Sequence, residues 1–279
     1  MTRFLVLSGG AASCAYEVGA VRYLIDIQNR TYDAYYGISG GALNAAFLSS
    51  YSLEKEAIKN LSNIWYNLKK SDIYQNWTFG YLSLLWRNSL YDTSPLRKTL
   101  ENNISPDNIK NSGKKLSIQT VALATGSTKV FTEQDPDIIS AILASSAMPI
   151  YFPPQKIQDV LYIDGGAKDM SNIEDAISEN DVDEIDLILT YPKDITADPD
   201  TDFSFLELIQ RFIRISIAKI GIDDILIAGL ENKLGKNIKI NIIRPQQELP
   251  ISTLGFCRDD IEKIIDIGFN DAKTFWSTL

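Results

Sequence analysis

The chain contains no histidine among its 279 residues. Ser-His-Asp triads need an imidazole to take the proton of the serine, and HExxH metalloproteases and imidazole-dependent zinc sites need histidine ligands. The sequence therefore excludes these classes. Any catalysis must use hydroxyl, carboxylate, amine or backbone groups.

Cysteine is also scarce, since the chain has only Cys14 and Cys257. Two cysteines are too few for a disulfide scaffold and indicate a reducing compartment. They are also too far apart in the sequence to build a cysteine-based zinc or iron–sulfur site. We expect no metal site and no cofactor.

Long hydrophobic runs are missing. No window approaches the roughly 20 apolar residues of a membrane-spanning helix. The apolar run at the N-terminus is shorter than the about 7–15 residues of a secretory signal. These features predict a cytoplasmic protein.

The net charge is −9, with 45% apolar and 23% charged residues. This composition is ordinary for one sizeable folded domain. An acidic balance argues against a nucleic-acid-binding protein, which shows a concentrated basic face. Contact with a membrane surface stays open, because local patches matter more than the total charge.

Short aliphatic segments alternate with segments of helical periodicity along the chain. The pattern predicts strands at 4–10, 32–39, 115–125, 128–133, 160–166, 184–192 and 237–245. It predicts helices at 15–28, 41–51, 136–148, 203–234 and 258–276. This alternation indicates an α/β fold with a largely parallel central sheet, and residues 1–279 form a single domain in this interpretation.

The segment 71–91 is rich in aromatic residues, with two tryptophans, three tyrosines and a phenylalanine beside four leucines. One interpretation is an amphipathic helix pair that packs on the core. The other is a cap that holds acyl chains or contacts a bilayer, where interfacial aromatic residues are favoured.

The five residues from Gly37 to Gly41 read Gly-Ile-Ser-Gly-Gly, between an apolar segment and an alanine-rich one. Gly-x-Ser-x-Gly is the pattern of a nucleophile elbow, a sharp strand-to-helix turn that exposes a reactive serine. Ser39 is therefore the candidate nucleophile, with Gly37 and Gly41 as the glycines of the elbow.

Asp164 is the candidate general base. It follows the apolar run at 160–163 and precedes two glycines, which favours a place at a strand end, in the crevice where open α/β sheets bind ligands. A carboxylate in a partly dry crevice can accept the serine proton directly, and burial raises its pKa from about 3.9. An ordinary Asp-Gly turn is the alternative. We expect Ser39 Oγ within about 3.5 Å of this carboxylate.

Acyl transfer also needs donors for the developing oxyanion. The loop at 8–13, between the first strand and the first helix, offers the backbone N–H groups of Gly9, Gly10 and Ala11. The N-terminus of the following helix adds positive potential. These three residues are the predicted oxyanion hole.

Four stretches in this order resemble the bacterial patatin-like phospholipases over nearly the whole chain. They are the glycine loop at 7–21, the elbow at 37–45, the run ASSAMPIYFPP at 144–154 and YIDGG at 162–166. The segment 90–100 is also similar to one common in that family.

The resemblance implies a three-layer α/β/α fold and a Ser39–Asp164 dyad that needs no calcium. It also implies hydrolysis of fatty-acyl esters in glycerophospholipids or related lipids through an acyl-enzyme. The implied partners are an acyl-ester lipid and, peripherally, a membrane surface, with no nucleic acid.

The glycine loop departs from the family pattern Gly-Gly-Gly-x-(Arg or Lys)-Gly. Here Ala11, Ser13 and Cys14 replace the third glycine, the basic residue and the last glycine. An alanine at positive φ costs on the order of 1 kcal/mol. The alternative function is therefore a weak or inactive relative that binds lipid or a protein partner.

Two asparagines lie near these segments. Asn44 and Asn172 are candidates for orienting the site, and capping of a buried turn is the alternative role for each.

Overall fold

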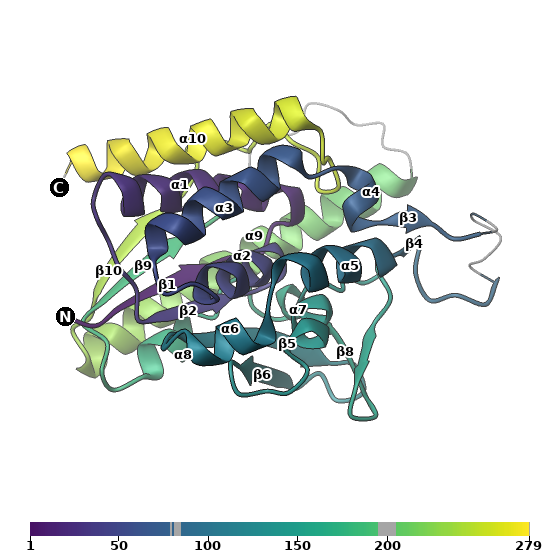
Figure 1. The fold of residues 1–279 in the computed structure, drawn as a ribbon, viewed down its shortest axis with the longest axis horizontal. Helices are drawn as coiled ribbons and strands as arrows, with labels where there is room; N and C mark the ends of the chain where they lie inside the picture. Colours follow the sequence, from purple (N-terminus) through teal and green to yellow (C-terminus); the bar gives the residue numbers. More distant parts are fainter. Residues whose placement is uncertain (79, 81–84, 195–204, 279) are drawn as a thin grey trace.

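The computed structural model describes residues 1–78, 80, 85–194 and 205–278 (Figure 1). Its central sheet has the strand order β10-β9-β1-β2-β5-β8-β7, with β6 paired to β5. Five neighbouring strands are parallel, namely β10 (Lys239–Ile243), β9 (Glu184–Ile188), β1 (Arg3–Leu7), β2 (Ala34–Gly37) and β5 (Lys115–Ala122). The predicted, largely parallel sheet is confirmed.

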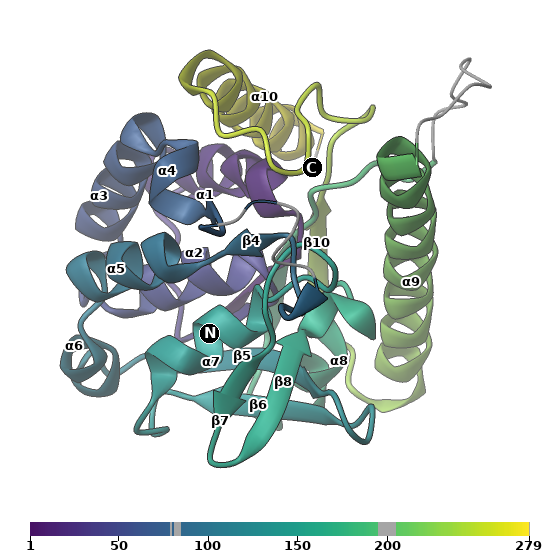
Figure 2. The same cartoon turned by 90° about the vertical axis from the view of Figure 1, so that its right-hand side faces the viewer.

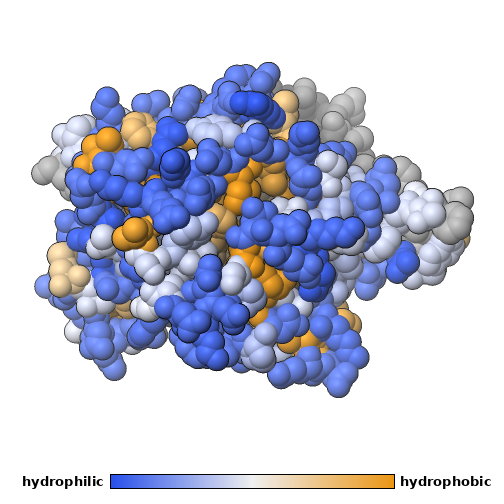
Figure 3. Space-filling model, in the orientation of Figure 1, coloured by the Kyte–Doolittle hydropathy of each residue, from blue (hydrophilic) through white to orange (hydrophobic). Residues whose placement is uncertain are grey.

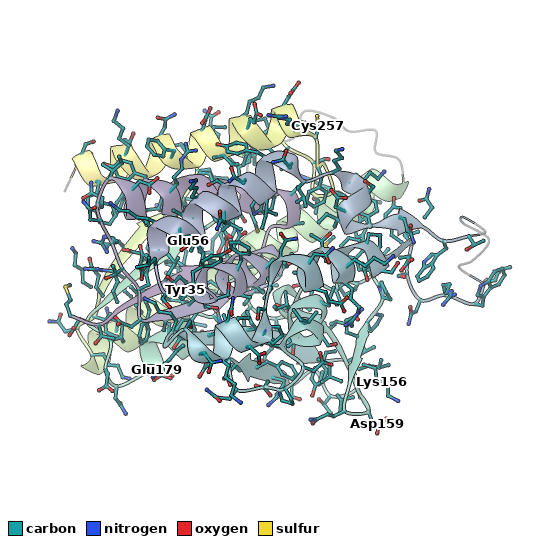
Figure 4. All side chains as sticks on the ribbon, viewed as in Figure 1. Tyr35, Glu56, Lys156, Asp159, Glu179 and Cys257 are labelled. Atoms are coloured by element: carbon teal, nitrogen blue, oxygen red, sulfur yellow. The ribbon has the colours of Figure 1, made fainter. Side chains whose placement is uncertain are left out.

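The edge of the sheet beyond β5 is antiparallel, which the sequence pattern did not indicate. It is formed by β6 (Thr128–Thr132), β7 (Gln155–Ile157) and β8 (Val160–Asp164). The β7–β8 hairpin ends in an exposed turn, where Lys156 and Asp159 form an ion pair of 2.7 Å (Figure 4).

Side chains of β1 alternate between the two faces of the sheet. Leu5 and Leu7 join the larger core with helices α1 (Ala15–Asp26), α2 (Gly40–Ser49), α3 (Glu54–Asn67) and α10 (Arg258–Ser277). Phe4 and Val6 join the smaller core with α8 (Ile173–Ser178) and α9 (Phe205–Gly235). Helices therefore cover both faces, and Figure 2 shows α9 on the side opposite α1, α2 and α3. The expected α/β/α sandwich is confirmed.

Shorter elements complete this part of the fold. They are the 3₁₀ turns η1 (Ala11–Cys14) and η3 (Gly165–Ala167) and the helices α4 (Lys70–Ile73), α5 (Ser94–Asn103), α6 (Pro106–Asn111) and α7 (Ile138–Ser145). Both cysteines are free thiols. Cys14 is buried, whereas Cys257 is exposed at the start of α10 (Figure 4).

The aromatic segment 71–91 differs from the expected helix pair in its described part. It contains the end of α4 and a two-stranded antiparallel ladder of β3 (Gln75–Asn76) and β4 (Tyr91–Asp92), and residues 79 and 81–84 lie outside the described residues. The Tyr74 and Tyr91 rings lie 4.6 Å apart. Among the described helices, none is long and apolar enough to cross a membrane.

Candidate active site

Ser39 lies at the turn between β2 and α2. Its φ of 54° and ψ of −125° are strained for a non-glycine residue, as the elbow pattern predicts. The two neighbouring glycines allow the chain to pack tightly there. A Cβ on Gly41 would lie 2.4 Å from the Ser8 carbonyl oxygen, and a Cβ on Gly37 would lie 2.5 Å from the Gly41 oxygen. Neither position accommodates a side chain.

Asp164 lies beside Ser39, although one strand of the sheet, β5, separates β8, which ends in Asp164, from β2, which precedes Ser39. Ser39 Oγ donates a hydrogen bond of 2.8 Å to Asp164 Oδ2, inside the expected 3.5 Å. The Gly166 N–H donates to the other carboxylate oxygen at 2.8 Å. Asp164 is the last residue of β8, at a strand end as the sequence pattern indicates, although β8 runs antiparallel to β5.

The Asp164 carboxyl group is 5% exposed. Burial raises its pKa to about 7, although the hydrogen bonds from the Gly166 N–H and the Ser39 hydroxyl act in the opposite direction. A carboxylate with this pKa is ionised in a large share of molecules at neutral pH. It is also a stronger base than an aspartate in water, which suits proton transfer from an alcohol.

Ser145 on α7 positions the elbow, and the sequence reasoning missed it. Its hydroxyl accepts a hydrogen bond of 3.0 Å from the Ser39 backbone N–H and donates one of 2.7 Å to the Gln119 carbonyl oxygen on β5. Its place in the run 144–154, which is typical of the family, was the available signal.

The three predicted oxyanion donors are not equivalent in the structure. The Gly9 N–H donates to the Met170 carbonyl oxygen at 3.0 Å, so this amide is occupied. The amides of Gly10 and Ala11 donate no hydrogen bond to another described residue, and both residues line the cavity beside Ser39. Ala11 has a φ of 50°, the left-handed conformation that a glycine adopts without cost.

Contacts from Thr190, two residues after the end of β9, hold the glycine loop in place. Thr190 Oγ1 donates to the Gly9 carbonyl oxygen at 2.6 Å, and the Thr190 N–H donates to Ser8 Oγ at 3.0 Å. On the far side of the loop, the Ala12 N–H donates to the Thr253 oxygen at 3.1 Å. The loop that carries the Gly10 and Ala11 amides, which have no partner among the described residues, is therefore held by hydrogen bonds on both of its sides.

Cys14 replaces the last glycine of the family pattern without blocking the elbow. Its Sγ lies 2.6 Å from the point that a Cβ on Gly40 would occupy. Because Gly40 has no side chain, the thiol fits against the start of α2.

Asp224 on α9 supports the opposite wall of the site, and the sequence reasoning missed it as well. Its Oδ2 accepts hydrogen bonds from the backbone N–H groups of Met170 at 2.8 Å and Ser171 at 3.0 Å. Burial raises its pKa to about 7, against these two hydrogen bonds. Met170 is also the residue whose carbonyl occupies the Gly9 amide, so α9 is linked to the glycine loop through one residue.

An apolar cavity of about 420 Å³ adjoins Ser39 and Asp164. Its volume is that of a site for a small organic ligand. Much of its wall comes from α3, α5 and the residue that follows α5, through Leu61, Ile64, Trp65, Leu96, Leu100 and Ile104. Figure 3 shows apolar surface at the centre of the face where α3 and α5 lie.

The fold has a counterpart among solved structures. VipD from Legionella pneumophila matches with a TM-score of 0.52 and 14% sequence identity, over 99% of this chain and 67% of VipD. The family model for patatin-like phospholipase matches residues 5–177, which contain every predicted site residue. The chain belongs to the patatin-like phospholipase family.

Two curated relatives are similar over more than half of the chain. The cGAMP-activated phospholipase of Escherichia coli (strain TW11681) is 27% identical in an alignment of 184 residues, which covers 59% of this chain and 51% of that protein. The probable lipid hydrolase 463L of Invertebrate iridescent virus 6 is 27% identical in an alignment of 173 residues, which covers 58% of this chain and 59% of that protein. The chain thus spans between half and two thirds of the length of these relatives.

Proposed function

We propose that this chain is a lipid acyl hydrolase that cleaves fatty-acyl esters, with Ser39 as nucleophile and Asp164 as general base. The observation that carries the proposal is the 2.8 Å hydrogen bond from Ser39 Oγ to the buried carboxylate, at the wall of an apolar cavity. Membership of the patatin-like phospholipase family supports the same reaction class.

In the first half of the proposed reaction, Asp164 Oδ2 takes the Ser39 proton while Oγ attacks the ester carbonyl carbon. The amides of Gly10 and Ala11 face the cavity without a partner among the described residues and donate to the resulting oxyanion. Collapse of the tetrahedral intermediate breaks the ester C–O bond. The leaving alkoxide takes the proton from Asp164, and the acyl group stays on Ser39.

Water completes the cycle. Asp164 accepts a proton from a water molecule as it attacks the acyl carbonyl, and the same two amides stabilise the second oxyanion. The bond to Ser39 then breaks, Oγ regains its proton from Asp164, and a fatty acid leaves. One carboxylate therefore acts as base and acid in turn, so no histidine is needed.

The substrate class follows from the cavity wall. Its largely apolar lining between α3 and α5 fits a fatty-acyl chain rather than a polar acyl group. Ile150 lines the cavity and is exposed, and Ile215 is exposed beside the lining residue Ser216. An apolar rim of this kind favours contact with a lipid surface, so we propose phospholipids or related acyl-ester lipids taken from a membrane.

A fluorophosphonate probe and p-nitrophenyl esters of different chain length test this function. We expect the probe to label Ser39, as located by peptide mapping, and hydrolysis to fall at least a thousandfold in Ser39→Ala and in Asp164→Asn. Absence of labelling in folded wild-type protein would favour the alternative, an inactive relative that binds lipid or a protein. Hydrolysis that persists in Ser39→Ala would show that another group is the nucleophile.

A further inference from the structure

We propose that Asn44 is a positioning residue, which holds the nucleophile helix, the glycine loop and the acyl-chain wall in register through one amide group. This inference rests on the proposed hydrolase function. It assigns Asn44 a role distinct from turn capping, because the residue lies inside α2, five positions after Ser39.

The Asn44 side chain uses both ends of its amide and is 1% exposed. Its Nδ2 donates to the Cys14 carbonyl oxygen at 3.1 Å and to Glu17 Oε2 at 2.8 Å. Its Oδ1 accepts a hydrogen bond of 2.8 Å from the indole Nε1 of Trp65. Because both N–H donors and the carbonyl oxygen have partners, the orientation of the amide is determined by its surroundings.

The hydrogen bonds of Asn44 connect three parts of the site, namely the glycine loop, the cavity wall and helix α2. Cys14 is the last residue of η1, the turn that begins at Ala11, so the position of its carbonyl oxygen depends on the position of the glycine loop. Trp65 lies on α3 and lines the cavity, as Asn44 itself does. Asn44 moves with the helix that Ser39 begins. A shift of any of the three parts therefore strains a hydrogen bond to the other two.

The Glu17 contact is costly in stability. Its side chain is fully buried, its Oε1 has no hydrogen-bond partner among the described residues, and desolvation raises its pKa well above the ordinary value despite the hydrogen bond from Asn44. An apolar side chain would fill this interior position without that cost. We therefore infer that the Asn44–Glu17 cluster serves to orient neighbouring groups rather than to stabilise the fold.

The second asparagine near the predicted site has no comparable set of contacts. Asn172 Nδ2 donates to the Ser117 carbonyl oxygen and hydroxyl at 3.3 Å, both on one residue of β5, and Asn172 does not line the cavity. The positioning role therefore falls to Asn44.

The test replaces Asn44 by leucine, which is similar in size and makes no hydrogen bond. The matched control is Asn241→Leu. Asn241 is 3% exposed and its Nδ2 donates to Glu184 and Asp186 at 2.8 Å, but it lies on β10, separated from β2 by β9 and β1. Active sites are counted by fluorophosphonate titration, so that unfolded protein does not lower the measured kcat.

We expect Asn44→Leu to lower kcat between about tenfold and a hundredfold, the effect of a small misplacement of reacting groups, with KM within threefold. Asn241→Leu should lower Tm but leave kcat within twofold. Trp65→Phe removes the indole N–H together with part of the ring that lines the cavity, and it should raise KM for long-chain esters with kcat within threefold. Glu17→Gln keeps an acceptor oxygen for Asn44 and should leave kcat within threefold.

A kcat within twofold of wild type in Asn44→Leu, with a fall in Tm like that of the control, would overturn the positioning role. If Asn44→Leu does not fold, Asn44→Asp, which keeps the size but loses at least one donor, must show the same fall in kcat. A wild-type protein that neither turns over esters nor reacts with the probe would instead overturn the hydrolase function itself, and the role of Asn44 with it.

Discussion

Asp164 lies directly opposite Thr120 in the antiparallel pair of β8 and β5. On the other side of β5, Gly37 at the end of β2 is paired with Ile118, two residues before Thr120. Ser39 follows Gly37 by two residues, so it arrives at the same level as Asp164 across one strand. The register of three strands thus brings together two side chains 125 residues apart in the chain.

The dependence of activity on pH should report the Asp164 carboxyl group. Because its pKa is raised to about 7 and only the ionised form accepts the Ser39 proton, kcat/KM for a short-chain ester should fall about tenfold per pH unit below pH 6 and level off above pH 8. Circular dichroism at each pH checks that the protein stays folded. A rate independent of pH between 5 and 8 would contradict this assignment.

Asp164→Asn should stabilise the protein at pH 8 while it abolishes activity. The pKa of this carboxyl group is about 7 in the folded state, against 3.8 in the unfolded state. The free energy of unfolding therefore decreases as pH rises between those two values, because the buried carboxylate ionises. Ionisation of Asp164 lowers the free energy of unfolding by at most about 4 kcal/mol. Replacing the carboxylate by the uncharged asparagine should recover at least about 1 kcal/mol of this at pH 8. Urea unfolding at pH 8 and at pH 4 measures the difference, which should almost vanish at pH 4.

Asp92→Asn is the control for that experiment. Burial raises the Asp92 pKa, but hydrogen bonds from Gln75 and Ser94 outweigh it, so that the pKa is lowered overall. Asparagine at this position should therefore give no gain at pH 8. Equal stabilisation by both substitutions would show that the effect does not come from the buried carboxylate.

Ala11→Gly tests the strain in the glycine loop. The left-handed φ of 50° costs alanine about 1 kcal/mol or more. Glycine removes this cost, but it increases the conformational entropy of the unfolded chain, which lowers stability by about 0.4–1 kcal/mol. We expect the free energy of unfolding to stay the same or rise by about 0.5 kcal/mol, and esterase activity to be kept or increased. Ala12 has no positive φ, so Ala12→Gly should cost about 1 kcal/mol. Destabilisation of equal size in both variants would refute the strain argument.

Leu100→Trp should shorten the acyl chain that the enzyme accepts. Leu100 is 4% exposed on α5 and lines the cavity, with Leu96 and Ile104 four residues to either side. The larger ring should lower kcat/KM for a dodecanoyl ester by about tenfold or more relative to an acetyl ester. Leu53→Trp, at an exposed position, should leave this ratio unchanged. An unchanged ratio in Leu100→Trp would place the acyl chain elsewhere.

Most of the sheet and the longest helices could be predicted from periodicity alone, because buried aliphatic strands and long apolar stripes have distinct patterns. The helices α3 and α5 were missed. Mean hydropathy along them is low, and their apolar residues face a cavity and neighbouring helices rather than the sheet. The antiparallel direction of β8 was also missed, since strand direction depends on pairing partners and not on the composition of the strand.

By itself, the sequence determined the chemistry that is available: a serine in a glycine-flanked turn, a carboxyl group before two glycines, and no imidazole. Covalent identity and local backbone preferences are sufficient for those statements. Only the tertiary structure decided which groups these residues bind: the Gly9 amide donates to Met170, Ser145 accepts from the Ser39 amide, Asp224 accepts from the Met170 amide, and Asn44 joins Cys14 to Trp65. Burial and hydrogen-bond partners arise from residues far apart in the chain, and no local pattern encodes them.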